Sequence, residues 1–422
     1  MKKLIVMLGL AFIMILCSCN GNSKNEKINE SKQTAISPST ARTTGSSISN
    51  EEVSIYDINN KEIGKIERYG ILVLTDDSII YNKIPTGSVD SITDMDYYRY
   101  IFKTKENIKL GTVKNWSYEA KYDTTVIGNS LYMYVTTGEI SDIKNRTLYL
   151  YKVDLSNNSM SVVFSERGGF PYNTMTAVGN KLLLVRVVAT GGSVLEEYNS
   201  ETNKRKLLKK FDFDDRANTG EAIRQITSDE NTISLLRLKI ESGGKIRMYL
   251  DVYDHNMIFL RSVDVSKIPS NSIDSPENEL RQGVSNFVVS NDYIYYANFS
   301  ITRFMGKITN NSLHPIMNVD PEFEMASESA KSKFSGLFYQ SFNKSNDLYL
   351  LSYTDGTLKR TTFNVDDERY YIINISRNTK NNLLITMRYK NPDTGEGLAP
   401  RLYYVNLSDL DFKRFIPSVL EK

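Results

Sequence analysis

The sequence predicts an all-β fold from residue 53 onward, and three observations support this prediction. Short segments rich in Val, Ile, Tyr and Phe alternate with tight turns built from Asn, Asp and Gly. Long segments with the 3.6-residue apolar period of an amphipathic helix are lacking. The strand and turn units also recur along the chain at a regular spacing. Together these features indicate strands joined by hairpins.

A polar turn followed by an apolar strand recurs seven times. The first strand residues of these repeats are Ile79, Leu131, Leu182, Ile233, Ile294, Leu348 and Leu383, at steps of 52, 51, 51, 61, 54 and 35 residues. A second family of turns alternates with the first, at residues 151–158, 198–203, 253–256, 308–311, 363–366 and 405–408. Each unit is therefore predicted to contain two tight hairpins, or four strands.

Four-stranded units that recur every ~40–50 residues are typical of a β-propeller, in which each blade buries its faces against its neighbours. We predict seven blades over residues 53–417, with six or eight as alternatives because the last step is short. A β-sandwich with a similar strand rhythm is the competing architecture. Residues 418–422 are predicted to be a C-terminal tail.

One hairpin of the second turn family, at residues 54–66, has no partner before it in the sequence. Pairing this hairpin into the last blade would cover strand edges that otherwise invite aggregation. We therefore expect it to close the ring.

The first twenty residues combine a basic start with a short apolar segment. Lys2 and Lys3 precede the apolar residues 4–16, which are too few for the ~20 residues that span a bilayer. Residues 1–18 are therefore predicted to be a signal peptide. Its last residues and the next one, Leu16-Cys17-Ser18-Cys19, resemble the lipobox of bacterial lipoproteins. A plain secretory signal is the alternative interpretation.

The lipobox resemblance implies that Cys19 is diacylated and becomes the mature N-terminus. Two acyl chains give stable membrane anchoring without a transmembrane helix. The expected location is the extracytoplasmic face of the cell membrane. Residues 19–52 follow as a polar segment rich in Ser, Thr, Asn and Lys. We interpret this segment as a flexible tether with a root-mean-square reach of roughly 30 Å.

Charge and reactive residues exclude several functions. The chain holds 52 basic and 50 acidic residues, and two lysines leave with the signal peptide, so the mature chain is neutral. We see no run of Lys or Arg that would indicate nucleic-acid binding. With Cys19 acylated, no thiol remains for a disulfide, a metal or a nucleophile. His255 and His314 lack a nucleophile motif nearby. We expect a monomer without a metal or cofactor.

The long connections between hairpins are the expected site of function, because such loops on a rigid ring usually carry binding or catalysis. We predict that they share one face of the ring, at residues 82–97, 136–146, 212–222, 267–284, 320–335 and 390–400. The candidate binding residues are Trp116, Tyr118, Asp214, Asp215, Asp393 and Glu396. The alternatives are packing between blades for the two aromatic residues and plain solvation for the acidic ones.

The chain resembles the broad group of bacterial lipoproteins that carry an extracytoplasmic β-propeller. The likeness rests on the lipobox and on strand rhythm, and it assigns a role to Cys19 alone. The leading hypothesis is a non-enzymatic surface lipoprotein that binds a protein, peptide or glycan through the long-loop face. The alternative is a glycan hydrolase or lyase, which needs two carboxylates about 5–9 Å apart.

Overall fold

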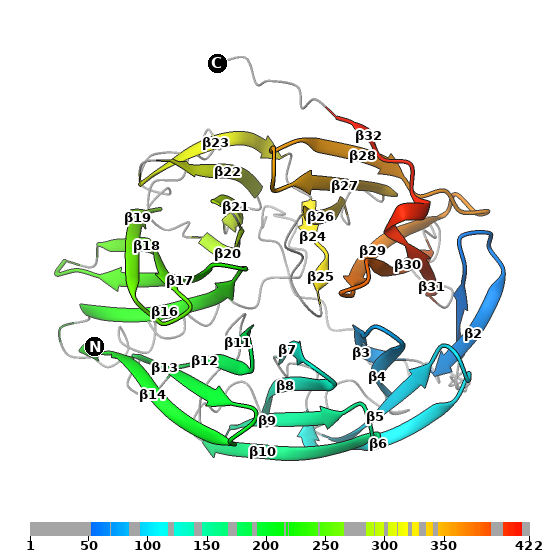
Figure 1. The fold of residues 1–422 in the computed structure, drawn as a ribbon, viewed down its shortest axis with the longest axis horizontal. Coiled ribbons are helices and arrows are strands. Elements are labelled where there is room, and N and C mark those ends of the chain that lie inside the picture. Colours follow the sequence, from blue (N-terminus) through cyan, green and yellow to red (C-terminus); the bar gives the residue numbers. More distant parts are fainter. Residues whose placement is uncertain are drawn as a thin grey trace, which may run out of the picture. The chain divides into compact units, whose positions relative to one another are not determined.

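Seven small sheets, which we call blades 1 to 7 in chain order, surround a common axis (Figure 1). The computed structural model describes residues 52–415 except for 68, 84–92, 117–121, 139–145, 168–174, 188–191, 215–216, 218, 244, 266–283, 291, 299–302, 310, 320–322, 329–334, 341–344 and 390–399. This arrangement confirms the predicted β-propeller, and the seven sheets lie within the range of six to eight that the sequence allowed. The described residues contain no helix long and apolar enough to cross a membrane.

The first four blades each contain four main strands, and blade 4 has in addition the short inner strand β15. Blade 1 is β3 (Tyr69–Leu74), β4 (Ser78–Lys83), β5 (Thr93–Ile101) and β6 (Asn107–Trp116). Blade 2 is β7 (Tyr122–Ile127), β8 (Ser130–Thr137), β9 (Thr147–Asp154) and β10 (Ser159–Arg167). Blade 3 is β11 (Met175–Val178), β12 (Lys181–Val187), β13 (Ser193–Asn199) and β14 (Lys204–Phe211). Blade 4 is β15 (Phe213–Asp214), β16 (Thr219–Ser228), β17 (Thr232–Ile240), β18 (Ile246–Asp254) and β19 (Phe259–Asp264).

Blade 5 is built from consecutive strands, whereas blades 6 and 7 include strands from distant parts of the chain. Blade 5 is β20 (Val284–Ser290), β21 (Tyr293–Asn298), β22 (Arg303–Thr309) and β23 (Ser312–Val319). Blade 6 is β24 (Phe323–Met325), β26 (Ser335–Gln340), β27 (Asp347–Ser352), β28 (Leu358–Thr362) and β32 (Lys413–Arg414). Blade 7 is β25 (Ser327–Glu328), β29 (Tyr370–Arg377), β30 (Asn382–Tyr389), β31 (Arg401–Asn406), β1 (Glu52–Tyr56) and β2 (Glu62–Glu67).

Most turns of the two predicted families form tight hairpins, and their residue types explain the shape. Gly128 and Gly179 adopt positive φ angles of 55° and 59° at the turns between the first two strands of blades 2 and 3. In the second family, Asp57 and Asp254 each accept two backbone N–H groups of their own turn through Oδ1. Such local hydrogen bonds favour a turn over a continuing strand.

The sequence misplaced the repeat in blade 6. The strand that begins near Leu348, β27, is the third strand of its blade, whereas the other six counted strands are second strands. The first strand, β24, lies within residues 320–335, which the sequence analysis interpreted as a loop. The second strand starts at Ser335, and this position divides the interval between Ile294 and Leu383 nearly in half. The uneven steps of 54 and 35 residues therefore arose because the third strand of blade 6 was counted in place of its second strand.

Two predicted turns of the second family are also corrected. Residues 363–366 connect blade 6 to blade 7 rather than two strands of one blade. Residues 405–408 lead from β31 into a single 3₁₀ turn, η1 (Leu407–Asp409), which is capped by the Asn406 side chain. The chain then passes to blade 6, where β32 pairs with the edge strand β28. The fourth-strand position of blade 7 is therefore left for another segment.

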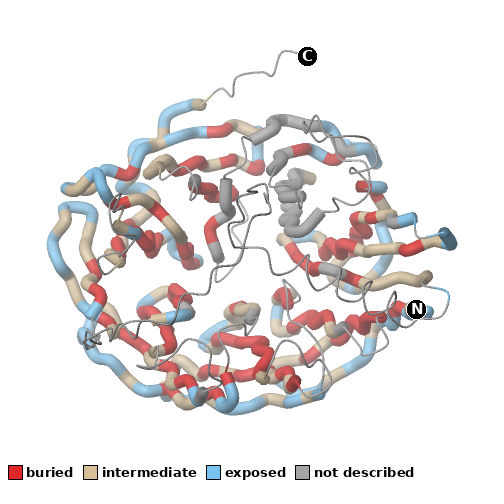
Figure 2. Tube along the Cα trace, turned by 180° about the vertical axis from the view of Figure 1, so that it is seen from behind, coloured by how far each residue is buried: buried red, intermediate tan, exposed pale blue. Residues whose placement is uncertain are grey.

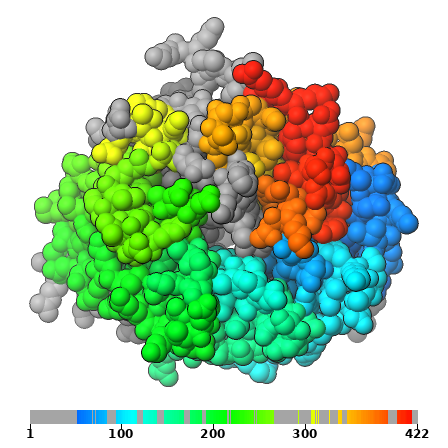
Figure 3. Space-filling view, in the orientation of Figure 1, coloured from blue at the N-terminus to red at the C-terminus, as the bar shows by residue number. Residues whose placement is uncertain are grey.

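The N-terminal hairpin fills that position, as the sequence predicted. Strand β1 pairs with β31 in a parallel register, Ile55 opposite Leu402, and β2 pairs with β1. In the space-filling view the N-terminal residues (blue) lie directly beside the C-terminal blade (red) (Figure 3). Val53 and Ile55 are fully buried against Leu384 of blade 7 and Leu74 of blade 1. The hairpin therefore joins the two ends of the ring.

The hydrophobic core is divided into clusters that lie between neighbouring blades. Leu131 and Met133 of blade 2 pack with Met95 and Val113 of blade 1, for example. Similar clusters join blades 2 and 3, 3 and 4, 4 and 5, 6 and 7, and 7 and 1. Buried residues are concentrated in the inner and middle strands, and exposed residues follow the outer edge strands (Figure 2). Blades 1, 2, 3, 4 and 7 therefore each bury apolar side chains against both of their neighbours.

Candidate functional site

Most of the residues that the sequence proposed for function lie outside the described part of the chain. These are Cys19, Tyr118, Asp215, Asp393 and Glu396. The long connections themselves fall largely in the same gaps, between strand ends that the structure does describe. The first of them is shorter than predicted, because β4 extends to Lys83 and β5 begins at Thr93.

Trp116 is not a surface residue. Its side chain is 4% exposed and lies in the cluster between blades 1 and 2, together with Val113 and Leu131. This burial contradicts the candidate binding role and agrees with the packing alternative. The sequence placed Trp116 in a connection between blades, but the residue ends strand β6, and its ring therefore packs inside the blade pair.

Asp214 is exposed, as a binding residue would be, but it sits in a short hairpin. It belongs to β15, which pairs with the start of β16, and its Oδ1 accepts the backbone N–H of Ala217 at 3.2 Å. The predicted connection 212–222 is thus partly strand. Asp214 shapes a turn at the inner edge of blade 4.

The described carboxylates Asp123 and Glu221 of the innermost strands hold neighbouring blades or neighbouring strands together. Asp123 on β7 accepts the backbone N–H of Met175 in blade 3 at 2.9 Å and that of Thr124 at 2.9 Å. Glu221 on β16 pairs with Arg237 on β17 at 2.9 Å. Arg237 also binds the buried Asp251 at 2.5 Å. These hydrogen bonds and ion pairs fix the acidic groups in structural roles.

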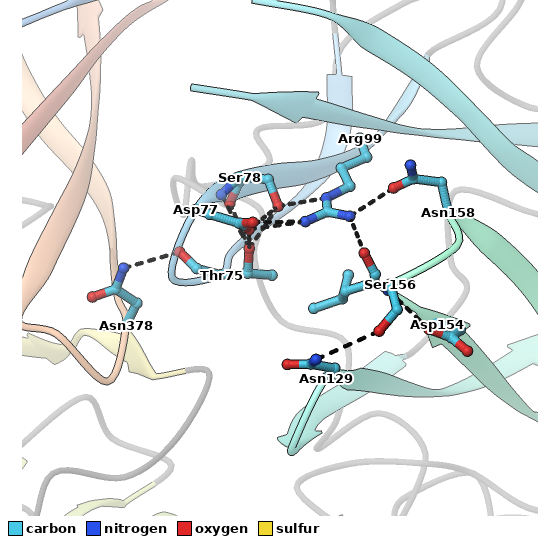
Figure 4. Close-up of polar contacts among 10 residues, drawn as sticks. Thr75, Asp77, Ser78, Arg99, Asn129, Asp154, Ser156, Asn158 and Asn378 are labelled. Atoms are coloured by element: carbon cyan, nitrogen blue, oxygen red, sulfur yellow. Dashed lines mark hydrogen bonds and ion pairs between the residues drawn. The ribbon is translucent and has the colours of Figure 1, made fainter. Parts of the chain in front are cut away.

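A buried arginine joins blades 1 and 2 (Figure 4). Arg99 on β5 is 4% exposed. Its Nε donates to Ser78 Oγ at 2.8 Å, and Nη2 donates to both carboxylate oxygens of Asp77 at 2.9 Å. Its Nη1 reaches into blade 2 and donates to the carbonyl oxygen of Leu155 at 2.5 Å and to Asn158 Oδ1 at 2.6 Å. The guanidinium is thus fully hydrogen-bonded, as a buried charge requires.

Asp77 is the ionic partner in this cluster. Partial burial acts to raise its pKa, but hydrogen bonds from Ser78 and Arg99 outweigh that effect and hold the pKa below its ordinary value. The carboxylate therefore stays ionised beside Arg99 at neutral pH. A turn of blade 1 is in this way fixed to a turn of blade 2.

A second charged network links blades 2 and 3. Arg186 binds Glu166 at 2.7 Å and Glu196 at 3.6 Å, and Arg205 binds both of the same carboxylates. Burial acts to lower the pKa of Arg205, but the hydrogen bonds to the two carboxylates raise it above its ordinary value. The Arg205 guanidinium also lies over the ring of Phe164, 4.3 Å from its centre.

Beside this network lies an open groove between the edge strands of blades 2 and 3. Its volume is about 460 Å³, and its walls include Lys152, Phe164, Tyr198 and Arg205. Sequence reasoning missed this groove because its residues come from strands that are about 40 residues apart. The described residues contain no cluster of three His, Cys, Asp or Glu side chains that could hold a metal ion.

Comparison with known proteins shows no family for this chain. No family model matches the sequence, and no curated protein matches it. One similar solved structure is a prolyl endopeptidase, with a TM-score of 0.47 and 10% identity, covering 77% of this chain and 47% of that one. This chain therefore spans about half the length of that enzyme.

Two further solved structures are similar over most of their own length. The β-propeller domain of the trilobed protease from Pyrococcus furiosus gives a TM-score of 0.44 and 9% identity, covering 84% of this chain and 98% of that one. An oligogalacturonate lyase from Vibrio parahaemolyticus gives a TM-score of 0.42 and 12% identity, covering 87% and 92%. Likenesses of this size say nothing about activity. The propeller architecture follows from the sheet topology of the chain itself.

Proposed function

We propose that this chain is a lipid-anchored surface protein whose propeller binds a protein, peptide or glycan through the long connections between hairpins. One observation carries the proposal: the three acidic residues with described side chains on the innermost strands, Asp123, Asp214 and Glu221, all bind other groups of the chain. An acid and base pair needs two carboxylates that are free to face a substrate. This use of the inner carboxylates favours binding over glycan cleavage.

The polar links between blades support a rigid scaffold. Arg99 joins blades 1 and 2, the Glu166 and Arg205 network joins blades 2 and 3, and a hydrogen bond between Thr176 and Ser228 at 2.7 Å joins blades 3 and 4. A rigid ring holds variable loops in a fixed geometry, which reduces the entropy cost of binding.

The anchor is tested with a pair of cysteine variants. Cys19→Ala is expected to leave the membrane fraction and to lose incorporation of a palmitate analogue, because it removes the proposed acceptor. Cys17→Ala is the matched control, because Cys17 lies inside the proposed signal peptide, and this variant should stay anchored. Membrane retention of Cys19→Ala with full labelling would refute the lipoprotein assignment.

The binding face is tested by cross-linked capture from native membranes, run beside a glycan array. Replacement of residues 391–397 or 267–282 by Gly-Ser segments of equal length should abolish capture of the partner. The control replaces Glu201 and Thr202 by Ala in a tight turn of blade 3 and should leave capture unchanged. Equal capture by all variants would contradict the assignment to the long connections. Release of sugar from a bound glycan, lost in Asp393→Asn or Glu396→Gln, would assign the chain to the hydrolases instead.

A further inference from the structure

Exposed apolar side chains are concentrated on three consecutive blades. Six large hydrophobic residues of the described chain are exposed, and five of them lie on or beside the edge strands β10, β14 and β19 of blades 2, 3 and 4. These five are between 51% and 60% exposed: Val162, Leu207, Ile258, Phe259 and Leu260. Apolar residues gathered in this way mark an interaction surface more often than scattered ones do.

The edge strand of blade 3, β14, lies between blades 2 and 4 and is strongly basic. Residues 204–210 of β14 read KRKLLKK, so the chain does contain a basic segment, contrary to the sequence-based expectation. Lys204, Lys206, Lys209 and Lys210 are exposed. Lys210 pairs with Asp212 at 2.5 Å, and within the described part of the chain Lys204, Lys206 and Lys209 form no salt bridge. Three lysine charges are therefore available to an external anion.

Contacts between the blades make this surface continuous. Lys209 Nζ donates to Tyr253 Oη at 3.3 Å, and the Tyr253 ring packs edge-on against Phe259, with 5.6 Å between ring centres. On the other side of β14, Arg205 and Phe164 share the groove of about 460 Å³. We call the surface formed by Val162, Leu207, the exposed lysines of β14 and residues 258–260 the basic flank.

We propose that the basic flank lies on an anionic lipid bilayer. Apolar side chains that enter the headgroup region, flanked by lysines that attract acidic lipids, are the two components of peripheral membrane binding. Ile258, Phe259 and Leu260 directly follow a tight turn at the start of β19 and supply the apolar component. The lysines of β14 supply the charge, and the groove lined by Lys152 and Arg205 has room for part of a headgroup. This inference rests on the proposed location of the chain at a membrane.

A second copy of the chain is a poor occupant of the same surface. A two-fold interface would place the lysines of β14 close to their own copies, and like charges in an interface oppose association. Lysines on an edge strand do protect it against aggregation. That role does not account for residues 258–260, because exposed apolar side chains on the next edge strand increase aggregation.

The proposed tether is long enough to allow this orientation. The 32 residues 20–51, which precede β1, reach about 110 Å when extended. A compact unit of about 370 residues has a radius of gyration of about 21 Å. The contour of the tether therefore exceeds the width of the propeller, and the anchor in Cys19 does not dictate which blades touch the membrane.

The test uses the mature-length chain, residues 19–422, with Cys19→Ala so that no acyl chain contributes. The chain should sediment with phosphatidylglycerol vesicles and not with phosphatidylcholine vesicles. Lys204→Gln and Lys206→Gln should each weaken partitioning about fivefold, the factor that corresponds to about 1 kcal/mol per lysine. The matched controls Lys103→Gln and Lys359→Gln remove the same charge from exposed positions in blades 1 and 6 and should leave partitioning unchanged.

Insertion is read from a tryptophan placed in the apolar turn. Phe259→Trp should shift its emission to the blue on phosphatidylglycerol vesicles and be quenched by brominated lipid, while the buried Trp116 gives a constant background. Absence of binding to phosphatidylglycerol, or equal losses in the flank and control variants, would overturn the proposal. Capture of an acidic protein without vesicle binding would also overturn it. Because the chain is not acylated, these results do not depend on whether Cys19 carries the anchor.

Discussion

Asn378 Nδ2 donates a hydrogen bond to the carbonyl oxygen of Thr75 at 2.9 Å, across 303 residues of sequence. The bond joins a turn of blade 7 to a turn of blade 1, and both residues are visible in Figure 4. Asn378 is 2% exposed, and its Oδ1 also accepts the backbone N–H groups of Lys380 and Asn382. One amide side chain thus shapes its own turn and links the first blade to the last.

Replacement of this side chain should weaken the ring. Asn378→Ala leaves a buried carbonyl and two backbone N–H groups without their partner, which costs about 1–3 kcal/mol for each buried group left unsatisfied. The free energy of unfolding, measured in urea, should fall by at least that amount. The control is Thr379→Ala, which removes an exposed hydrogen bond to Asp76 between the same two blades and should cost much less. Equal losses of unfolding free energy in the two variants would show that burial of the hydrogen bond between Asn378 and Thr75 is unimportant.

Deletion of the N-terminal hairpin, residues 53–67, should destabilise the ring more than any other deletion of similar size. It removes the buried Val53, Ile55 and Ile66 and exposes the edge of β31. Thermal melting and gel filtration of the chain are the measurements. Truncation after Leu410 removes β32, whose two residues are exposed, and provides the comparison with a smaller expected effect. An unchanged midpoint with a monomeric profile would show that the hairpin does not close the ring.

The hairpin can also be disturbed by a single methyl group. A Cβ at Gly64 on β2 would overlap the hydroxyl of the buried Tyr100 in blade 1. Gly64→Ala should therefore cost about 1–3 kcal/mol, the usual range for overpacking. The same substitution should cost less in a Tyr100→Phe background, because the overlapping hydroxyl is gone. Additive losses in the double variant would contradict this contact.

The Asp77 and Arg99 pair predicts a dependence of stability on pH. The pKa of Asp77 is lower in the folded chain than in the unfolded chain, so its contribution is present above the ordinary Asp pKa of about 3.9 and is lost as the pH falls through the folded-state value. The stability difference between wild type and Asp77→Asn should be constant above about pH 5 and shrink in acid. Asp411→Asn, which removes a charge from an exposed position, controls for net charge. A difference that does not change in acid would contradict the ionic role.

Limited proteolysis tests the boundary between tether and propeller. The first cuts should fall within residues 20–52 and release a resistant core that begins near Val53, because β1 is buried in blade 7. N-terminal sequencing and intact mass identify the core. First cuts within the hairpins would place the boundary elsewhere.

Local signals in the sequence were enough for the all-β class, the tight turns and six of the seven second strands. Turn residues such as Gly128 and Asp254 act on their immediate neighbours, so their effect can be read from a few residues. The same reasoning failed in blade 6, where β24 has three residues and leaves too short an apolar pattern to recognise. It also placed Trp116 in a connection, because the end of β6 carries no turn signal.

The strand rhythm, the turn chemistry and the unpartnered hairpin that closes the ring could all be predicted from the amino-acid sequence. Tertiary structure decided which groups meet: Asn378 with Thr75, Arg99 with Leu155, and the lysines of β14 with the apolar turn at residues 258–260. The physical reason is that hydrogen-bonded turns are set by neighbours in the chain. Contacts between blades depend instead on how sheets that are about 50 residues apart pack against one another, and this packing has no local signature.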